Sequence, residues 1–176
     1  MTAVMKLTPE AKTALRRCLP GMEGTQWVSE LAATHGWQEA NRRYLASMRE
    51  QGIREMLGLM EDLGISEVVS DEDALELLET AVAVYLPEAE VRRTTGDGGT
   101  LALQITVKDC PTYARIEQSG WHGVTACGSW HRRQGWYQAL GVNAVDSVVG
   151  EKKWGDIACM ALVQLATPAD QGTVRE

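Results

Sequence analysis

The sequence contains no phenylalanine, no Cys-x-x-Cys pair, no basic stripe and no long apolar run. Without Phe, the core must be filled by Leu, Val, Met and the six Trp residues. The four cysteines, Cys18, Cys110, Cys127 and Cys159, are widely spaced and match no zinc-ribbon signature. In a cytosolic chain, such cysteines are more typical of thiols than of disulfides.

The charge balance also limits the class of partner. Lys and Arg number 17 against 24 Asp and Glu, which gives a net charge of −7. A nucleic-acid-binding protein carries a basic stripe, and Arg132-Arg133 is too short to be one, so we expect no nucleic acid partner. No apolar run approaches the roughly 20 residues of a membrane span. The first seven residues have no apolar core of a signal peptide, so we expect a cytoplasmic chain with no membrane partner.

The 176 residues are enough for one domain, and the first half of it reads as helical. Capping residues, C-terminal glycines and apolar positions three and four residues apart predict helices over 8–18, 22–34, 38–63 and 70–85. Gly52 and Gly58 interrupt the long third helix. Such glycines weaken a helix, and they predict a close helix contact or a bend.

The apolar period changes in the second half of the chain. Leu101, Leu103, Ile105 and Val107 alternate with other residues after a glycine-rich turn, which predicts a hairpin with a partner strand over 90–93. Further helices are predicted over 111–119 and 124–140, and further strands over 143–149 and 156–165. The fold class is therefore α+β, a single domain with a helical layer (1–87), an antiparallel sheet with inserted helices (88–166) and a frayed tail (167–176).

Reactive side chains are concentrated between residues 110 and 159. They are three cysteines, two histidines and one aspartate: Cys110, His122, Cys127, His131, Asp156 and Cys159. Cys127 and His131 are four residues apart on the helix predicted over 124–140. Their side chains are therefore expected to share one face of that helix.

Three interpretations of this cluster compete. In the first, Cys127 is a nucleophile, and His131 or His122 activates its thiol or acts as the base. In the second, four side chains bind zinc or another soft metal, if a metal is present: Cys110, Cys127, His131 and Cys159. In the third, the cysteines are small buried hydrophobic residues without any chemistry.

Aromatic residues in the same region indicate a ligand pocket. We expect Trp121 and Trp130 at the rim of an apolar or aromatic pocket, and Trp136 in the core. Arg115, on the helix predicted after the second cysteine, is placed to meet a carboxylate ligand. The predicted substrate-binding set is Trp121, Trp130, Arg115 and Tyr113.

Three short segments carry a resemblance to known families. They are Asp109-Cys110-Pro111-Thr112-Tyr113, Ala126-Cys127 and Gly155-Asp156-Ile157-Ala158-Cys159. Together they resemble the L-2-amino-thiazoline-4-carboxylic acid hydrolase-like group. The last segment also resembles the vinyl-reductase (4-vinyl reductase) small-molecule-binding domains, which are related in fold to trafficking subunits. The chain is further similar to a bacterial family of about this length with the same three-cysteine pattern.

The resemblance implies a helical layer on a twisted antiparallel sheet, often in a homodimer. It also implies a hydrolase that opens a thiazoline ring, with Asp156 in a turn of the site. Gly128-Ser129-Trp130-His131 stands where hydrolase-like members often have acidic residues. This difference favours a Trp-lined pocket with a Cys–His pair over the substrate of that hydrolase.

We therefore expect a cytosolic hydrolase or lyase that acts on a small sulfur- or nitrogen-containing molecule. The predicted catalytic residues are Cys127, His131, His122 and Asp156, and the cofactor considered is a soft metal such as zinc. The alternative is a non-catalytic module that binds a ligand, a metal or a tetrapyrrole. A third alternative is an assembly subunit with an exposed apolar helix face. The expected partners are a small molecule and a second copy of the chain.

Overall fold

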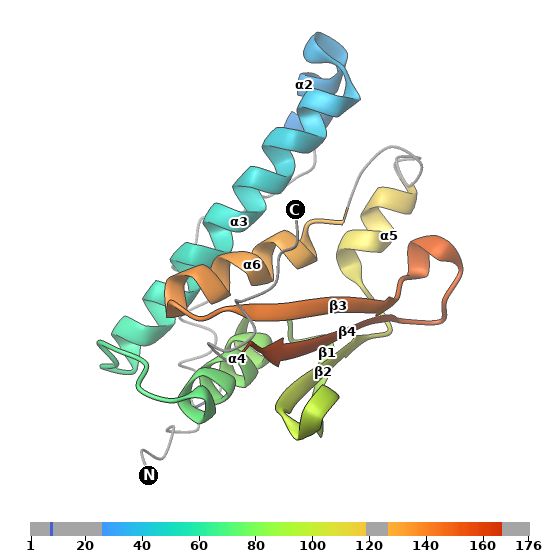
Figure 1. The fold of residues 1–176 in the computed structure, drawn as a ribbon. Coiled ribbons are helices and arrows are strands. Elements are labelled where there is room, and N and C mark those ends of the chain that lie inside the picture. Colours follow the sequence, from blue (N-terminus) through green and yellow to red (C-terminus); the bar gives the residue numbers. More distant parts are fainter. Residues whose placement is uncertain (1–7, 9–25, 119–126, 167–176) are drawn as a thin grey trace, which may run out of the picture.

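The computed structural model describes Thr8, residues 26–118 and residues 127–166. These residues contain five α-helices and a four-stranded antiparallel sheet, so the α+β prediction is confirmed (Figure 1). Apart from Thr8, the helix predicted over 8–18 lies outside the described residues. The tail predicted over 167–176 lies outside them as well.

Three helices make up the N-terminal layer. They are α2 (Gln26–His35), α3 (Trp37–Asp62) and α4 (Asp71–Tyr85). Gly36 separates α2 from α3 with a φ of 82°, a conformation that glycine adopts without steric cost. At the start of α4, the Ser70 side chain accepts a hydrogen bond of 3.1 Å from the backbone N–H of Asp73, as the predicted cap requires.

The sheet is formed by four strands in the order β1-β2-β4-β3. They are β1 (Ala89–Thr95), β2 (Leu101–Val107), β3 (Ala144–Gly150) and β4 (Cys159–Leu165). The hairpin predicted from the alternating residues is present, with Val91 opposite Ile105. The last strand begins at Cys159 rather than at 156, because Gly155 has a φ of 95° and the chain is still turning there.

Two helices are inserted between the strands, α5 (Pro111–Gln118) and α6 (Ser129–Leu140). The prediction that the second of these begins at 124 is wrong for the part that the structure describes. Cys127 and Gly128 precede the helix, and Gly128 is its N-cap. Gly128 packs tightly against α3, since a Cβ on it would lie 2.8 Å from the Tyr44 hydroxyl oxygen. Cys127 therefore does not belong to the helix on which it was predicted to share a face with His131.

The core lies between the helices and one face of the sheet. Its members come from α3, α4, α6 and the central strands, with Trp136 and Leu103 among the most buried. Successive side chains of a strand point to opposite faces of the sheet. In β2 and β4, Ile105 and Ala161 point to the helices and are buried. Their neighbours Gln104 and Leu162 point to the opposite face and stay partly exposed. The core position predicted for Trp136 is confirmed by its 1% exposure.

Helices α3 and α6 cross with their backbones in contact. A Cβ on Gly52 would lie 2.0 Å from the carbonyl oxygen of Arg132, and a Cβ on Gly135 would lie 2.2 Å from that of Arg49. No side chain fits in either place. The close contact predicted for Gly52 is confirmed, whereas a Cβ on Gly58 would meet no atom within 4 Å.

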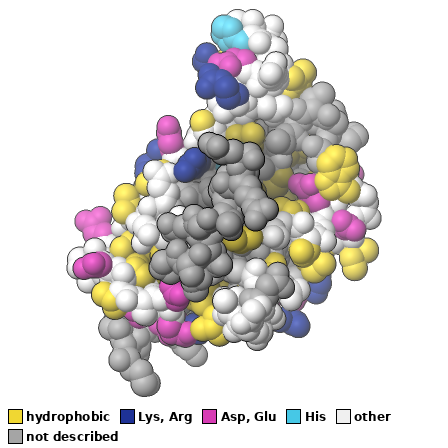
Figure 2. Space-filling model, viewed as in Figure 1, with side chains coloured by type: hydrophobic (Ala, Val, Ile, Leu, Met, Phe, Trp, Pro, Cys, Tyr) yellow, Lys and Arg dark blue, Asp and Glu magenta, His cyan; other side chains and the backbone are white. Residues whose placement is uncertain are grey.

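On the face of the molecule seen in Figure 2, acidic and basic side chains are interspersed with hydrophobic ones. Among the described helices, none combines the length and the apolar character that crossing a membrane requires. Figure 1 shows α2 and the first half of α3 extending beyond the sheet. They pack on each other through a separate small apolar cluster around Val28, Ala40 and Tyr44.

The glycine contact generates a stability prediction. We expect Gly52→Ala to lower the free energy of unfolding by about 1–3 kcal/mol, because α3 and α6 must move apart to admit the methyl group. Urea denaturation followed by circular dichroism measures this change. The matched variant Gly58→Ala lies on the same helix in open space and should raise the free energy of unfolding by up to about 1 kcal/mol. Equal effects of the two variants would contradict the close contact of α3 and α6 at Gly52.

Candidate functional site

A cavity of about 260 Å³ lies between the sheet and helices α3 and α6. Most of its wall is apolar, formed by Tyr44, Met48, Tyr85, Leu86, Ile105, Val107, Val148, Met160 and Ala161. An apolar cavity of about 150 Å³ is already large enough to take up benzene. Pockets for drug-sized ligands occupy about 300–1,000 Å³, so this cavity falls just below that range and has the size for a compact ligand.

Three of the four cysteines meet at this cavity. Cys110 comes from the end of the segment between β2 and α5, Cys127 from the residues before α6, and Cys159 from the start of β4. Each of them is half-buried. Sheet pairing brings two of them together, since Val107 lies opposite Cys159 and Cys110 follows three residues later. Residues distant in the sequence thus supply three thiols to a single wall.

Two of these thiols accept hydrogen bonds from the backbone. The Cys110 Sγ accepts from the N–H of Tyr113 at 3.3 Å, and the Cys159 Sγ accepts from the N–H of Lys152 at 3.4 Å. Burial raises the pKa of the Cys159 thiol, and the Lys152 N–H opposes this rise only in part. Cys159 is therefore a protonated thiol at neutral pH.

Cys127 differs from the other two in its surroundings. Its Sγ donates to the Ser129 hydroxyl at 3.4 Å, and the Tyr44 side chain lies close by. Burial, followed by the charge of a Cys127 thiolate, raises the pKa of Tyr44 to about 12, while a backbone hydrogen bond from Gly128 lowers it. The Tyr44 hydroxyl thus keeps its proton throughout the physiological range.

The first of two buried ion pairs lies beside the cavity. Glu55 of α3 is fully buried and accepts hydrogen bonds from Arg132 at 2.7 Å, Gln51 at 2.8 Å and Trp136 at 3.0 Å. The Tyr85 hydroxyl donates to the backbone carbonyl of Glu55 at 3.0 Å. The carboxylate therefore has several partners, and it fixes Arg132 in the cavity wall.

The second ion pair joins α6 to the edge strand β3. Arg133 donates two hydrogen bonds to Asp146, at 2.8 Å and 3.0 Å, and the Tyr137 hydroxyl donates to the same carboxylate at 2.8 Å. Burial lowers the pKa of Arg133, but Asp146 and Tyr137 together raise it above its ordinary value. Burial also raises the pKa of Tyr137, which stays neutral. Both arginines in the cavity wall are thus charged and paired.

Neither ion pair was among the predicted site residues. A signal for Glu55 was present in the sequence, because it falls three residues after Gly52 and four before Leu59, in the buried stripe of α3. A carboxylate in an apolar stripe needs a buried cation, and Arg132 and Arg133 are adjacent basic residues of the helix predicted over 124–140. The pairing of Glu55 with Arg132 depends on how α3 and α6 cross.

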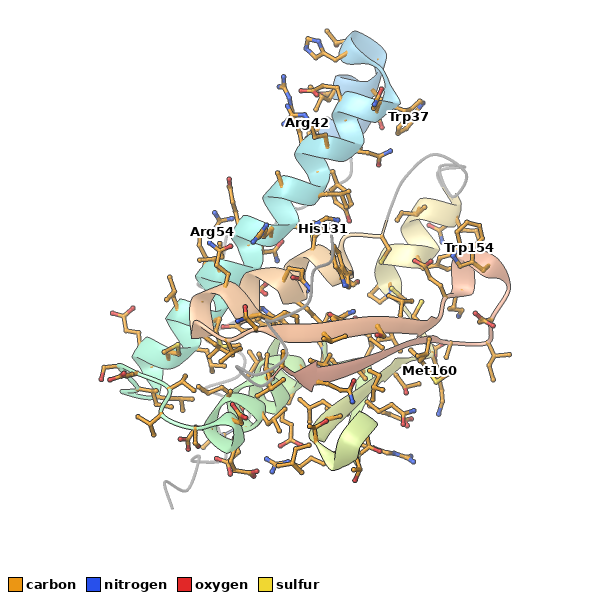
Figure 3. All side chains as sticks on the ribbon, in the orientation of Figure 1. Trp37, Arg42, Arg54, His131, Trp154 and Met160 are labelled. Carbon is orange, nitrogen blue, oxygen red and sulfur yellow. The ribbon has the colours of Figure 1, made fainter. Side chains whose placement is uncertain are left out.

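His131 does not line the cavity that the three cysteines border. The His131 ring packs edge-on against Trp130 with 4.8 Å between ring centres, and it is not among the residues that line the cavity. Burial, followed by the charge of Arg49, lowers its pKa. Figure 3 shows it on the side of α6 towards α3. The prediction that Cys127 and His131 share a helix face is wrong, because α6 begins two residues after Cys127.

Asp156 also lies outside the cavity wall. It is exposed in the turn before β4, where its carboxylate accepts the N–H of Glu151 at 2.8 Å. Trp130 does line the cavity, and its indole N–H donates to the backbone carbonyl of Asp146 at 3.2 Å. Trp130, predicted at the rim of a pocket, therefore borders this cavity, and its role in binding stays a prediction.

Four predicted residues remain: Tyr113, Arg115, Trp121 and His122. Tyr113 faces a neighbouring shallow cleft, where the Nζ of Lys152 is 5.9 Å from its ring centre. Trp121 and His122 lie outside the described residues, as does the side chain of Arg115. Their predicted roles in binding and catalysis stay predictions.

The structure bears on the predicted metal ligands in one respect. In residues 26–118 and 127–166, no three His, Cys, Asp or Glu side chains are grouped so that they could hold a metal ion. The three cysteines of the predicted set border one cavity, and His131 does not. The four-ligand arrangement is therefore not assembled among the described residues.

The sequence matches no protein-family model and has no significant match among curated proteins. The fold is similar to that of a trafficking protein particle complex subunit 3 from Naegleria fowleri, whose crystal structure has palmitic acid covalently bound. The two share 14% identity over 89% of this chain and 95% of that chain, with a TM-score of 0.56. It is also similar to the phenol-responsive sensory domain of the transcription activator PoxR, crystallised with phenol, at 14% identity over 80% of this chain and 71% of that chain, with a TM-score of 0.53. At these identities the likeness shows a common fold alone.

The buried pair at the cavity generates a second stability prediction. We expect Glu55→Gln to lower the free energy of unfolding by about 3–5 kcal/mol, because the Arg132 charge then lies beside the cavity without its counterion. Urea denaturation measures the loss. Glu50→Gln, five residues earlier on α3 and exposed, should change the free energy of unfolding by less than about 0.5 kcal/mol. A Glu55→Gln protein as stable as the Glu50→Gln protein would show that the pair does not hold the helices together.

Proposed function

We propose that the chain is a binding domain for a compact and largely apolar small molecule. The observation that carries this proposal is the cavity of about 260 Å³ behind the sheet, with aromatic and aliphatic side chains over most of its wall. Transfer of apolar surface from water into such a cavity is favourable by about 25 cal/mol per Å². A site of this kind, apolar with a few polar groups, is typical of small-molecule binding.

The polar groups of the wall define the second requirement on the ligand. The hydroxyls of Tyr44 and Ser129 and the guanidinium group of Arg132 border the cavity at the end near Cys127. A ligand that left them without hydrogen bonds would pay for their desolvation. We therefore propose a ligand with one hydroxyl or carbonyl group on an apolar body.

The side chains of the wall and the small volume favour a ring over a long chain. Tyr44, Tyr85 and Trp130 offer aromatic surfaces, and Met48 and Met160 offer thioethers that adapt to a ring edge. Of the two structural neighbours, one was crystallised with palmitic acid and the other with phenol. A compact ring such as phenol agrees with the cavity volume, and we take it as the probe.

Binding of phenol tests the proposal. We expect phenol to bind the purified chain and to raise its unfolding temperature, because a ligand that binds the folded state stabilises it. The variant Ala161→Leu should raise the Kd for phenol at least about tenfold, because the larger side chain fills the cavity from β4. Calorimetric titration measures both values.

The matched control is Ala33→Leu, the same substitution at an exposed position of α2. It should leave the Kd for phenol unchanged. Equal Kd values for the wild type and Ala161→Leu would place any phenol site outside this cavity and contradict the proposal.

A hydrolase or lyase that uses Cys127 is the second candidate, and the position of Cys127 on the cavity wall favours it. Such an enzyme needs a base near the sulfur. His131 and Asp156 lie outside the cavity wall, which leaves His122 as the predicted base. Cys127→Ala should abolish turnover of a small thiazoline by this enzyme, as followed by chromatography of the ring-opened product. Full turnover in that variant would remove Cys127 from the mechanism.

A further inference from the structure

We infer that the cavity selects a ligand with a positive charge, namely a compact ring compound that carries an ammonium group on a short arm. This inference rests on the proposed function, because it assigns a charge to the ligand of the same cavity. The observation that carries it is the presence of Glu88 and Glu151 in the cavity wall, both half-buried. Among the residues that the structure describes, neither carboxylate accepts a hydrogen bond or forms an ion pair.

The two glutamates lie at the same end of the sheet. Glu88 directly precedes β1 and Glu151 directly follows β3, and the antiparallel order β1-β2-β4-β3 puts the start of β1 and the end of β3 at one end. Three strand spacings separate these outer strands, which is roughly 14 Å. Figure 1 shows α5 and the turn after β3 at this end of the sheet. A ligand group that reaches this end therefore lies between two carboxylates.

The two guanidinium groups of the wall do not offset this negative charge. Arg132 is paired with Glu55 and lies 5.9 Å from the ring centre of Tyr85. Arg133 is paired with Asp146 through two hydrogen bonds. Each guanidinium group thus has a buried carboxylate of its own, and the charge that remains on the wall is that of the two glutamates. An anionic ligand would find no unpaired cation among these residues.

The charge of Glu151 acts at the wall itself. Burial is the main reason why the pKa of the Cys159 thiol is raised, and the charge of Glu151 is one of the smaller causes, so this carboxylate lies close to the sulfur. The neighbouring cation is turned to the adjoining cleft. The Nζ of Lys152 donates to the backbone carbonyl of Lys108 at 2.6 Å and is 5.9 Å from the ring centre of Tyr113. Lys152 does not line the cavity.

An amine on a short arm meets both requirements of the cavity. Its ring occupies the apolar space, and a hydroxyl on the ring meets the polar groups of Tyr44 and Ser129. An alkylamine is protonated at neutral pH, as the lysine side chain is. A charge in an apolar site is costly unless it is paired, and the two glutamates supply the pairing. Tyramine, a phenol with an aminoethyl arm, has all of these groups.

Calorimetric titration of the full-length chain with three phenols tests the inference. Tyramine carries an ammonium group on a two-carbon arm, 4-ethylphenol has the arm without a charge, and 3-(4-hydroxyphenyl)propanoate carries a carboxylate on it. We expect a Kd for tyramine at least about tenfold below that for 4-ethylphenol, because tyramine gains a charge pair with a half-buried carboxylate. The propanoate should have the highest Kd, because its charge is repelled. Equal Kd values for tyramine and 4-ethylphenol, or tightest binding of the propanoate, would overturn the inference.

A double variant tests the two residues. Glu88→Gln with Glu151→Gln removes both charges and keeps the side-chain shapes, so tyramine and 4-ethylphenol should then bind with about the same Kd. Its binding of 4-ethylphenol reports that the cavity is intact. The matched control, Glu61→Gln with Glu67→Gln, makes the same change in net charge at two exposed positions that do not line the cavity, and it should keep the preference for tyramine. An unchanged preference in the first variant would contradict the inference.

The neutral phenol separates this inference from the proposed function. If 4-ethylphenol binds and tyramine binds no more tightly, the binding function stands and the selection of a cation is refuted. If none of the three compounds binds, the proposed function fails and the inference fails with it. Ala161→Leu should weaken the binding of tyramine and of 4-ethylphenol alike. Undiminished binding of tyramine in that variant would place the amine outside the cavity and refute its selection there.

Discussion

The contact of two glycines, Gly52 on α3 and Gly135 on α6, sets the position of nearly everything around the cavity. Because neither residue has a side chain, the helix backbones touch, and a Cβ at Gly52 would lie 2.0 Å from the carbonyl oxygen of Arg132. At that separation the side chain of Arg132 reaches Glu55, one turn along α3. The ion pair is therefore a consequence of the backbone contact.

The buried pair in turn shapes the cavity. Arg132 is held by Glu55, and Arg133 is held by Asp146 of the edge strand, so both guanidinium groups border the apolar space in fixed positions. Charges buried in this way cost free energy unless every donor and acceptor is paired. The pairing is extensive, with Trp136 and Tyr137 completing the two networks. The result is a small cavity with an apolar wall and an ordered polar end.

Several features of the fold could be predicted from local patterns, and particular residues show why. Ser70 caps α4 through the N–H of Asp73, and the alternation of Leu101 to Val107 gives a strand, because both signals act within a few residues. The start of α6 could not be predicted in this way. Cys127 and Gly128 would continue a helical pattern, but Gly128 packs against Tyr44, which is more than 80 residues away in the sequence. Because that boundary was wrong, the prediction that Cys127 and His131 share a helix face was wrong as well.

In the candidate site, too, some features follow from local sequence signals and others from contacts between distant residues. The sequence by itself determined which residues carry reactive groups, the helical and extended segments that hold them, and the concentration of thiols in the second half. Only the tertiary structure decided that Cys110, Cys127 and Cys159 meet while His131 and Asp156 do not, and that Glu55 lies beneath Arg132. The physical reason is that propensities and caps act over one turn of helix or one strand. The meeting of distant residues depends on strand register and on how closely two helices approach.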